Sequence, residues 1–136
     1  MDQAALSLQA INERLTSSPF NRWLQIEAIR IVAPGQVELR MPWRAELEGG
    51  KGMTHGGIFA CVIDASAFAA ILSVKGQTGP TIDMRVDFHA NAFDADFSID
   101  AQVIRAGSRI ATADVRILSA SGKLLASGRC VYAAAA

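Results

Sequence analysis

The sequence has few cysteines, no excess of charge and no basic N-terminal region followed by an apolar run. Cys61 and Cys130 lack CxxC spacing, so we expect a cytoplasmic protein with reduced thiols. Lysine plus arginine number 13 and aspartate plus glutamate number 13, so no general field favours a polyanion, and nucleic acid is not an expected partner. No set of His, Cys and carboxylates has metal-ligand spacing, and we expect no metal and no cofactor.

The apolar content is high, and its distribution favours one folded unit. A length of 136 residues with 51% hydrophobic and 19% charged residues is typical of one compact domain, which we expect to span residues 1–136. The longest apolar run, Gly56 to Val74, approaches the length of a membrane span, but Asp64 lies near its middle. We therefore expect a buried core helix and no membrane contact.

The N-terminal half predicts a helix, a hairpin and a loop. Apolar residues at three- and four-residue steps indicate a helix capped by Asp2 and stopped by Ser17-Ser18-Pro19. Alternation from Leu24, with a change of phase near Ile29 that a bulge would allow, predicts a strand. A turn at Pro34-Gly35 joins it to a second strand ending at Met41, and the glycine-rich segment 42–54 predicts a mobile loop.

The C-terminal half predicts the long helix followed by four strands. In the first strand Ile82, Met84, Val86 and Phe88 alternate with polar residues that begin at Thr81. The other predicted strands are Phe97 to Ile104, Ile110 to Leu118 and Lys123 to Tyr132. These four most simply form an antiparallel meander, with the hairpin added to the same sheet and the helix on its concave face, which is an α+β fold. The terminal alanines, Ala133 to Ala136, predict a frayed end.

The segment His55-Gly56-Gly57 opens the long helix and is the first candidate site. The first N–H groups of a helix lack internal acceptors and carry the positive end of its dipole, so this segment can bind an anion or a developing oxyanion. The alternative is that the glycines only permit a tight turn and His55 bonds the loop.

Asp64 is the second candidate, because it is the one charged side chain between His55 and Lys75. It either reaches a partner group, lies on a wet side of the helix, or serves as an acid or base. Gly56 and Asp64 are eight residues apart, which is about 12 Å of helical rise. If both act on one substrate, they come from different copies, and catalysis then predicts a homodimer.

Four segments together resemble a known family. They are Gly52-x-x-His55-Gly56-Gly57 with Asp64, Thr81 to Phe88, Arg105-x-Gly107, and Gly122 to Gly128. The chain resembles hotdog-fold thioesterases of the phenylacetic-acid-degradation (PaaI-like) type. The resemblance implies a long helix wrapped by a sheet of about six strands, a homodimer or homotetramer, and hydrolysis of acyl-CoA without a cofactor.

The same resemblance assigns roles to residues. It implies that the Gly56 N–H donates to the thioester oxygen and that Asp64 of the opposite subunit is the general base or nucleophile. It implies that His55 braces the loop and that Thr81 orients water. Substrate contacts would involve Gly57, with Arg105 and Arg109 near the phosphates of coenzyme A or, alternatively, as solvated strand ends.

One position departs from the family pattern. Gly49 stands where the family commonly has asparagine, and Asn21 or Gln77 could supply an amide instead. Two other functions stay open: a non-hydrolytic module that binds acyl-CoA or an aromatic ligand, and a hydratase or dehydratase that uses His55 and Asp64.

The remaining candidates have weaker support. Phe20, Trp23 and Trp43 either line an acyl pocket or belong to the core. His89 is expected to be a surface or interface group, and Cys61 a buried, unreactive thiol.

Overall fold

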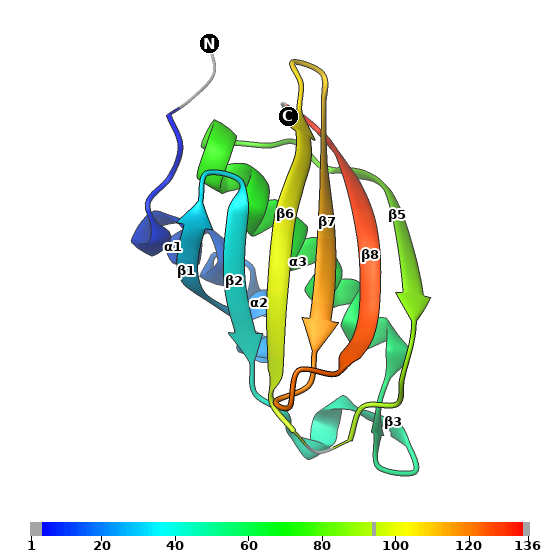
Figure 1. The fold of residues 1–136 in the computed structure, drawn as a ribbon. Helices are drawn as coiled ribbons and strands as arrows, with labels where there is room; N and C mark the ends of the chain where they lie inside the picture. Colours follow the sequence, from blue (N-terminus) through cyan, green and yellow to red (C-terminus); the bar gives the residue numbers. More distant parts are fainter. Residues whose placement is uncertain (1–3, 94, 135–136) are drawn as a thin grey trace.

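The computed structural model describes residues 4–93 and 95–134, which form a six-stranded antiparallel sheet around one long helix (Figure 1). The strand order is β1-β2-β6-β7-β8-β5. The elements are α1 (Leu8–Thr16), α2 (Pro19–Leu24), β1 (Glu27–Ala33), β2 (Gln36–Met41), η1 (Ala45–Leu47), β3 (Glu48–Gly50), β4 (Met53–Thr54), α3 (Gly56–Lys75), β5 (Thr81–Phe88), β6 (Phe97–Ala106), β7 (Ile110–Leu118) and β8 (Leu124–Ala133).

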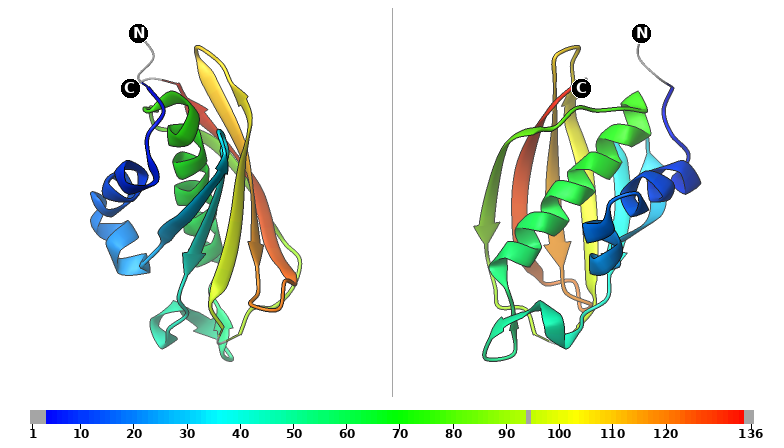
Figure 2. Two further views of the ribbon diagram at one scale, coloured as in Figure 1. Left: turned by 60° about the vertical axis from the view of Figure 1, so that its left-hand side comes forward. Right: turned by 180° about the vertical axis from the view of Figure 1, so that it is seen from behind.

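The long helix α3 crosses the inner face of the sheet, with α1 and α2 beside it near β1 (Figure 2). It is apolar on nearly every side because it is covered on nearly every side, and its buried residues include Val62, Ile63 and Ile71. It ends at Gly76, whose φ of 73° is the left-handed conformation typical of a C-terminal glycine. By length and composition α3 could cross a membrane, but its burial against the sheet already accounts for its apolar surface.

The sheet confirms the predicted fold class and corrects one part of the predicted topology. β6, β7 and β8 form a meander, but β5 pairs with β8 and not with β6. Both edges of β6 are taken, by β2 and by β7, so β5 closes the far end of the sheet. Spacing along the chain predicts strands but does not decide which edge each strand joins. The β5 edge carries consequences for function.

The segment before the sheet differs from its prediction. α1 is capped by Ser7, whose side chain accepts a hydrogen bond from the Ala10 N–H, while the predicted cap Asp2 lies outside the described residues. Ser17-Ser18-Pro19 does not only stop a helix; Ser18 caps α2 and Pro19 occupies its first turn. The predicted hairpin is present as β1 and β2, with a register shift between Ala28 and Arg30.

Two predicted irregular regions contain structure. Residues 42–54 hold the short helix η1 and the hairpin β3–β4 rather than a plain loop. The N–H of Thr54 donates to the Ala92 carbonyl at 2.8 Å, and the N–H of His55 donates to the Leu47 carbonyl at 2.8 Å. At the other end of the chain, Ala134 is buried and its N–H donates to the Arg109 carbonyl, so the predicted frayed end is wrong there; residues 135–136 lie outside the described part.

Candidate active site

The first half of the site is the N-terminal tip of α3. His55 is the N-cap, and its Nδ1 accepts a hydrogen bond from the Gly57 N–H at 2.8 Å. In this bond Nδ1 is the acceptor, and the Gly57 N–H is already engaged within the protein, so it is not free to bind a substrate. Gly56 is the first helical residue, so its N–H has no acceptor within α3. Of the two glycine amides predicted to contact substrate, the one at Gly56 is better placed to do so.

Gly49 packs closely against this tip. A Cβ at position 49 would lie 2.8 Å from the His55 Cα and 3.0 Å from its Cβ. Real Cβ atoms essentially never lie as close as 2.8 Å to another carbon, so the hairpin approaches His55 at a distance that only glycine permits. Both residues border a hollow of about 450 Å³ that also includes Gly56. The backbone around position 49 therefore leaves no room for the asparagine side chain that the family commonly has there.

The second half of the site centres on Asp64, which is half-buried on α3. Its Oδ1 accepts a hydrogen bond from Thr81 Oγ1 at 2.8 Å and a second, short one from the Tyr132 hydroxyl. The prediction that Asp64 reaches a partner is thereby met by two hydroxyl groups. Sequence reasoning selected Thr81 but not Tyr132, which it placed only at the end of a strand.

Thr81 reaches Asp64 because of an irregularity in β5. Strict alternation puts Thr81 on the polar face with Asp83, pointing away from the helix. The pairing of β5 with β8 shifts register between Thr81 and Asp83, so Thr81 lies opposite the inward-facing Tyr132. The predicted direction of the Thr81 side chain is therefore wrong. Thr81 points inward, and its hydroxyl reaches Asp64.

A pocket of about 360 Å³ opens beside Asp64, between α3 and the α1–α2 corner. Phe20 and Asn21 line it from α2, and Cys61 and Phe68 line it from α3. Asn21 is thus the predicted amide that reaches this half-site, whereas Gln77 follows the opposite end of α3. Trp23 stacks on Phe20 at 5.9 Å between ring centroids. Trp43 lies elsewhere, donating its indole N–H to Thr54 Oγ1 at 3.2 Å.

Cys61 borders this pocket as a protonated thiol. Burial, followed by the negative charge of Asp64, raises the pKa of Cys61 above its usual value. A thiol with a raised pKa is a poor nucleophile at neutral pH. The structure therefore supports the prediction of an unreactive cysteine, although this side chain is only half-buried.

Arg105 and Arg109 lie at the β6–β7 hairpin. Both are exposed and flank Gly107, whose carbonyl accepts a hydrogen bond from Lys75 Nζ at 2.5 Å. Because Lys75 is the last residue of α3, this hairpin lies at the opposite end of the helix from Gly56 (Figure 1). Within one chain the two arginines are therefore remote from the amide tip.

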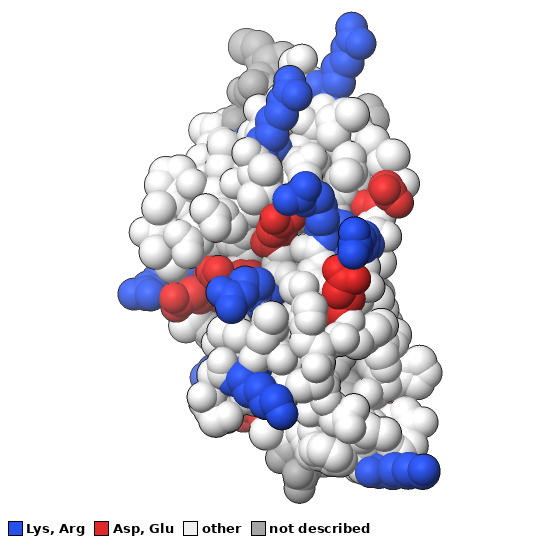
Figure 3. Space-filling model, turned by 45° about the vertical axis from the view of Figure 1, so that its right-hand side comes forward, with Lys and Arg blue, Asp and Glu red and all other residues white. Residues whose placement is uncertain are grey.

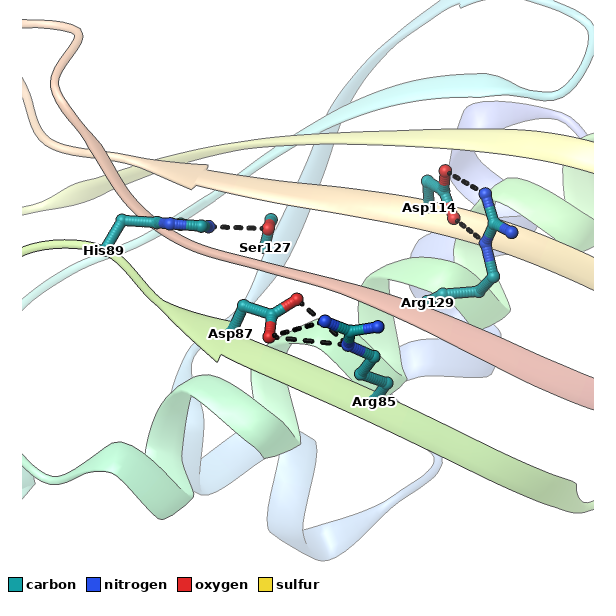
Figure 4. Close-up of polar contacts among 6 residues, drawn as sticks. All are labelled: Arg85, Asp87, His89, Asp114, Ser127 and Arg129. Atoms are coloured by element: carbon teal, nitrogen blue, oxygen red, sulfur yellow. Dashed lines mark hydrogen bonds and ion pairs between the residues drawn. The ribbon is translucent and has the colours of Figure 1, made fainter.

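The outer face of the sheet carries charged side chains of both signs (Figure 3). Arg129 forms a two-point ion pair with Asp114, at 2.6 and 2.9 Å, and Arg85 Nε lies 3.2 Å from Asp87 (Figure 4). His89 lies on the same face with Nε2 2.8 Å from Ser127 Oγ, so it is a surface group as predicted. Within residues 4–93 and 95–134, no three His, Cys, Asp or Glu side chains are grouped to hold a metal ion.

The two half-sites are not joined within one chain. Gly56 and Asp64 border different hollows, and the eight-residue separation along α3 amounts to about 12 Å. An attacking group and an oxyanion donor have to lie about 3 Å from the same reacting atoms. One chain thus contains both candidate half-sites but does not bring them together.

A six-stranded antiparallel sheet curved around a long central helix is the hotdog fold, and the comparisons with known proteins place the chain within it. The family model described as the thioesterase superfamily matches residues 51–126. The chain belongs to this superfamily, and it is a thioesterase, an enzyme that hydrolyses thioesters.

Individual relatives match over nearly the whole chain. The human protein acyl-coenzyme A thioesterase 13 is 30% identical over 133 residues, covering 95% of each chain. A solved structure of another thioesterase-superfamily protein is 39% identical, with a TM-score of 0.87, and covers 93% of this chain and 96% of that one. Zebra fish thioesterase superfamily member 2 is 29% identical, with a TM-score of 0.85, and covers 96% and 99%.

Proposed function

We propose that this chain hydrolyses acyl-CoA thioesters at a composite site built by two copies, with Asp64 of one copy and the Gly56 N–H of the other. The acyl-CoA substrate is suggested by the name of the human relative. The observation that carries the composite site is the arrangement of β5 relative to α3.

The strand β5 is a free edge with an apolar surface. It is last in the strand order, so one side of its backbone is unpaired among the described strands. Ile82 is 58% exposed and Phe88 is 60% exposed. An edge strand with large exposed apolar side chains is a template for pairing with another strand. A second copy of β5 is the partner that matches it in length and chemistry.

Pairing of two β5 strands would bring the half-sites together. Thr81 begins β5 and contacts Asp64, while Phe88 ends β5 and its ring lies against Gly56, 3.1 Å from where a Cβ would be. A twofold axis near the middle of β5 makes the paired strands antiparallel, which puts the Thr81 end of one copy beside the Phe88 end of the other. Asp64 then faces the partner's Gly56.

This arrangement supplies the groups that thioester hydrolysis needs. The Gly56 N–H, at the positive end of the α3 dipole, stabilises the oxyanion that forms on the carbonyl oxygen, and a donor of this kind contributes about 10²- to 10³-fold in rate. As a general base, Asp64 takes a proton from water while the water oxygen bonds to the carbonyl carbon. The C–S bond then breaks, and coenzyme A leaves as a thiol after taking up a proton. As a nucleophile, an Asp64 oxygen instead bonds to that carbon and the C–S bond breaks to release coenzyme A. Water then hydrolyses the resulting mixed anhydride to the free acid and the Asp64 carboxylate.

In this arrangement the two arginines of the β6–β7 hairpin lie nearer to the site of the other copy. Because the partner's α3 runs in the opposite direction, the β6–β7 hairpin of one copy comes nearer to the amide tip of the other. Arg105 and Arg109 then suit the phosphates of coenzyme A, since guanidinium groups pair well with phosphate oxygens.

Release of free thiol from a panel of short, medium, long and aromatic acyl-CoA esters tests the proposal. Asp64→Asn should lower kcat/KM by at least about 100-fold, because a positioned general base contributes about 10²- to 10⁴-fold. Asp100→Asn, the same change on β6 and away from the β5 edge, is the matched control and should leave turnover unchanged. Unchanged turnover in Asp64→Asn would remove Asp64 from the mechanism. Tight binding of acyl-CoA by the unaltered protein without thiol release would favour the binding module instead.

A further inference from the structure

Tyr132 makes the closest contact with Asp64 in the molecule, although it lies 68 residues away in the sequence. It belongs to β8, is 4% exposed, and its ring lies 6.4 Å from that of Phe68. Its hydroxyl lies within hydrogen-bond distance of the main-chain carbonyl of Asp64, at 2.7 Å, and of the Asp64 Oδ1, and these two acceptors share its single proton. The surrounding side chains therefore fix this phenol before any substrate arrives.

The Tyr132 hydroxyl is protonated at neutral pH and can act as a donor. Burial, followed by the hydrogen bond to Asp64, raises the pKa of Tyr132 well above its usual value. The phenol therefore stays protonated at neutral pH, with its hydroxyl within hydrogen-bond distance of the carboxylate. A neutral donor beside a carboxylate forms a charge-assisted hydrogen bond, which is stronger than a bond between neutral groups.

The two hydroxyls divide the Asp64 carboxylate into a held oxygen and a free one. Thr81 Oγ1 and the Tyr132 hydroxyl both donate to Oδ1. Among the hydrogen bonds of the described residues, none uses Oδ2. An aspartate on a helix otherwise has several accessible rotamers, and the terminal torsion of its carboxylate is soft. Two donors on one oxygen remove that freedom and leave Oδ2 as the oxygen available to the pocket.

We propose that Tyr132 is a positioning residue that holds Asp64 Oδ1 so that Oδ2 alone meets the water or the thioester carbon. This role rests on the proposed function of Asp64. Tyr132 does not touch substrate in this account; it acts through the carboxylate. The advantage is geometric, because a reacting oxygen displaced by 1 Å costs about 100-fold in rate.

Tyr132→Phe tests the inference, because it removes the hydroxyl and keeps the ring that packs against Phe68. The kcat should fall by about 10- to 100-fold, the loss expected for a charge-assisted hydrogen bond, while KM for acyl-CoA stays within about twofold. A change in kcat below about threefold would overturn the inference. A rise in KM with unchanged kcat would place Tyr132 in substrate binding and would also overturn it.

A double variant separates positioning from a structural effect. If Tyr132 acts only through the Asp64 carboxylate, adding Tyr132→Phe to Asp64→Asn should leave the residual kcat within about twofold of that of Asp64→Asn alone. The same 10- to 100-fold loss in both backgrounds would show a general structural role and contradict the inference. The single Asp64→Asn variant separates the positioning role of Tyr132 from the proposed function. Full activity in that variant refutes the proposed catalytic role of Asp64 itself.

Discussion

Replacement of Ile82 by aspartate tests the proposed pairing of β5 strands. Ile82 is 58% exposed in the isolated chain, so this change has little effect on the chain's own core. Full burial of an isoleucine contributes about 1.5 to 3 kcal/mol. The exposed fraction thus corresponds to about 1 to 2 kcal/mol in each copy, or about 2 to 4 kcal/mol for a symmetric pair. That loss alone raises the dimer Kd by about 30- to 1000-fold.

The new carboxylates add to this effect, because a charge buried at an interface without a partner costs several kcal/mol. Sedimentation equilibrium together with thiol release at the same concentrations provides the assay. We expect Ile82→Asp to be monomeric at micromolar concentration and to lose activity in step with the dimer. Ile29→Asp is the matched control, since Ile29 is 41% exposed on β1 at the opposite edge of the sheet. A monomeric Ile82→Asp variant with full activity would refute the reasoning.

Three further predictions concern single sites. Gly49→Asn should lower the unfolding temperature by several degrees without raising thiol release. The new Cβ would lie 2.8 Å from the His55 Cα, and overpacking of this kind costs about 1 to 3 kcal/mol. Higher activity at unchanged stability would contradict the close contact. Burial raises the pKa of Cys130 from 9.0 to about 12, so the native state favours the neutral thiol. The unfolding free energy measured in urea should therefore fall as pH rises from about 9 to 12, by about 1.4 kcal/mol per pH unit from this thiol, with the buried Tyr132 phenol adding to the fall above its usual pKa; a flat profile would contradict this. Arg105→Ala combined with Arg109→Ala should raise KM for acyl-CoA several-fold with kcat unchanged, and an unaltered KM would return both arginines to the solvated surface.

The sequence was sufficient for most of the fold, because its patterns are local. The apolar stretch that became α3 and the alternation in β5 and β7 each need only a window of about 11 to 18 residues to be seen. The pairing of β5 with β8 was not predictable in this way, since both edges of β6 were equally open to a strand of that pattern. The helix α2 was missed because Ser17-Ser18-Pro19 can end one helix and begin another.

The candidate site was predictable in part for the same reason. Gly56 and Asp64 stand out locally, one at a glycine-rich helix start and the other as a lone charge in an apolar helix. Tyr132 does not stand out, because its role depends on register across the sheet and on a sequence separation of 68 residues. Thr81 was selected by resemblance, yet its direction was predicted wrongly, since a register shift of one residue reverses the face on which a side chain lies.

The composite site is tested most directly by a mixed dimer purified with two different tags. One chain carries Asp64→Asn and the other carries Gly56→Pro, which removes the N–H at the first helical position. Each variant alone should be inactive as a homodimer. Because an added Cβ would lie 3.1 Å from the Phe88 ring, Gly56→Ala, which adds the Cβ and keeps the N–H, is the matched control. The mixed dimer contains one intact site and one doubly altered site, so the account predicts about half of the wild-type turnover per dimer. A mixed dimer as inactive as its two parents would contradict the account.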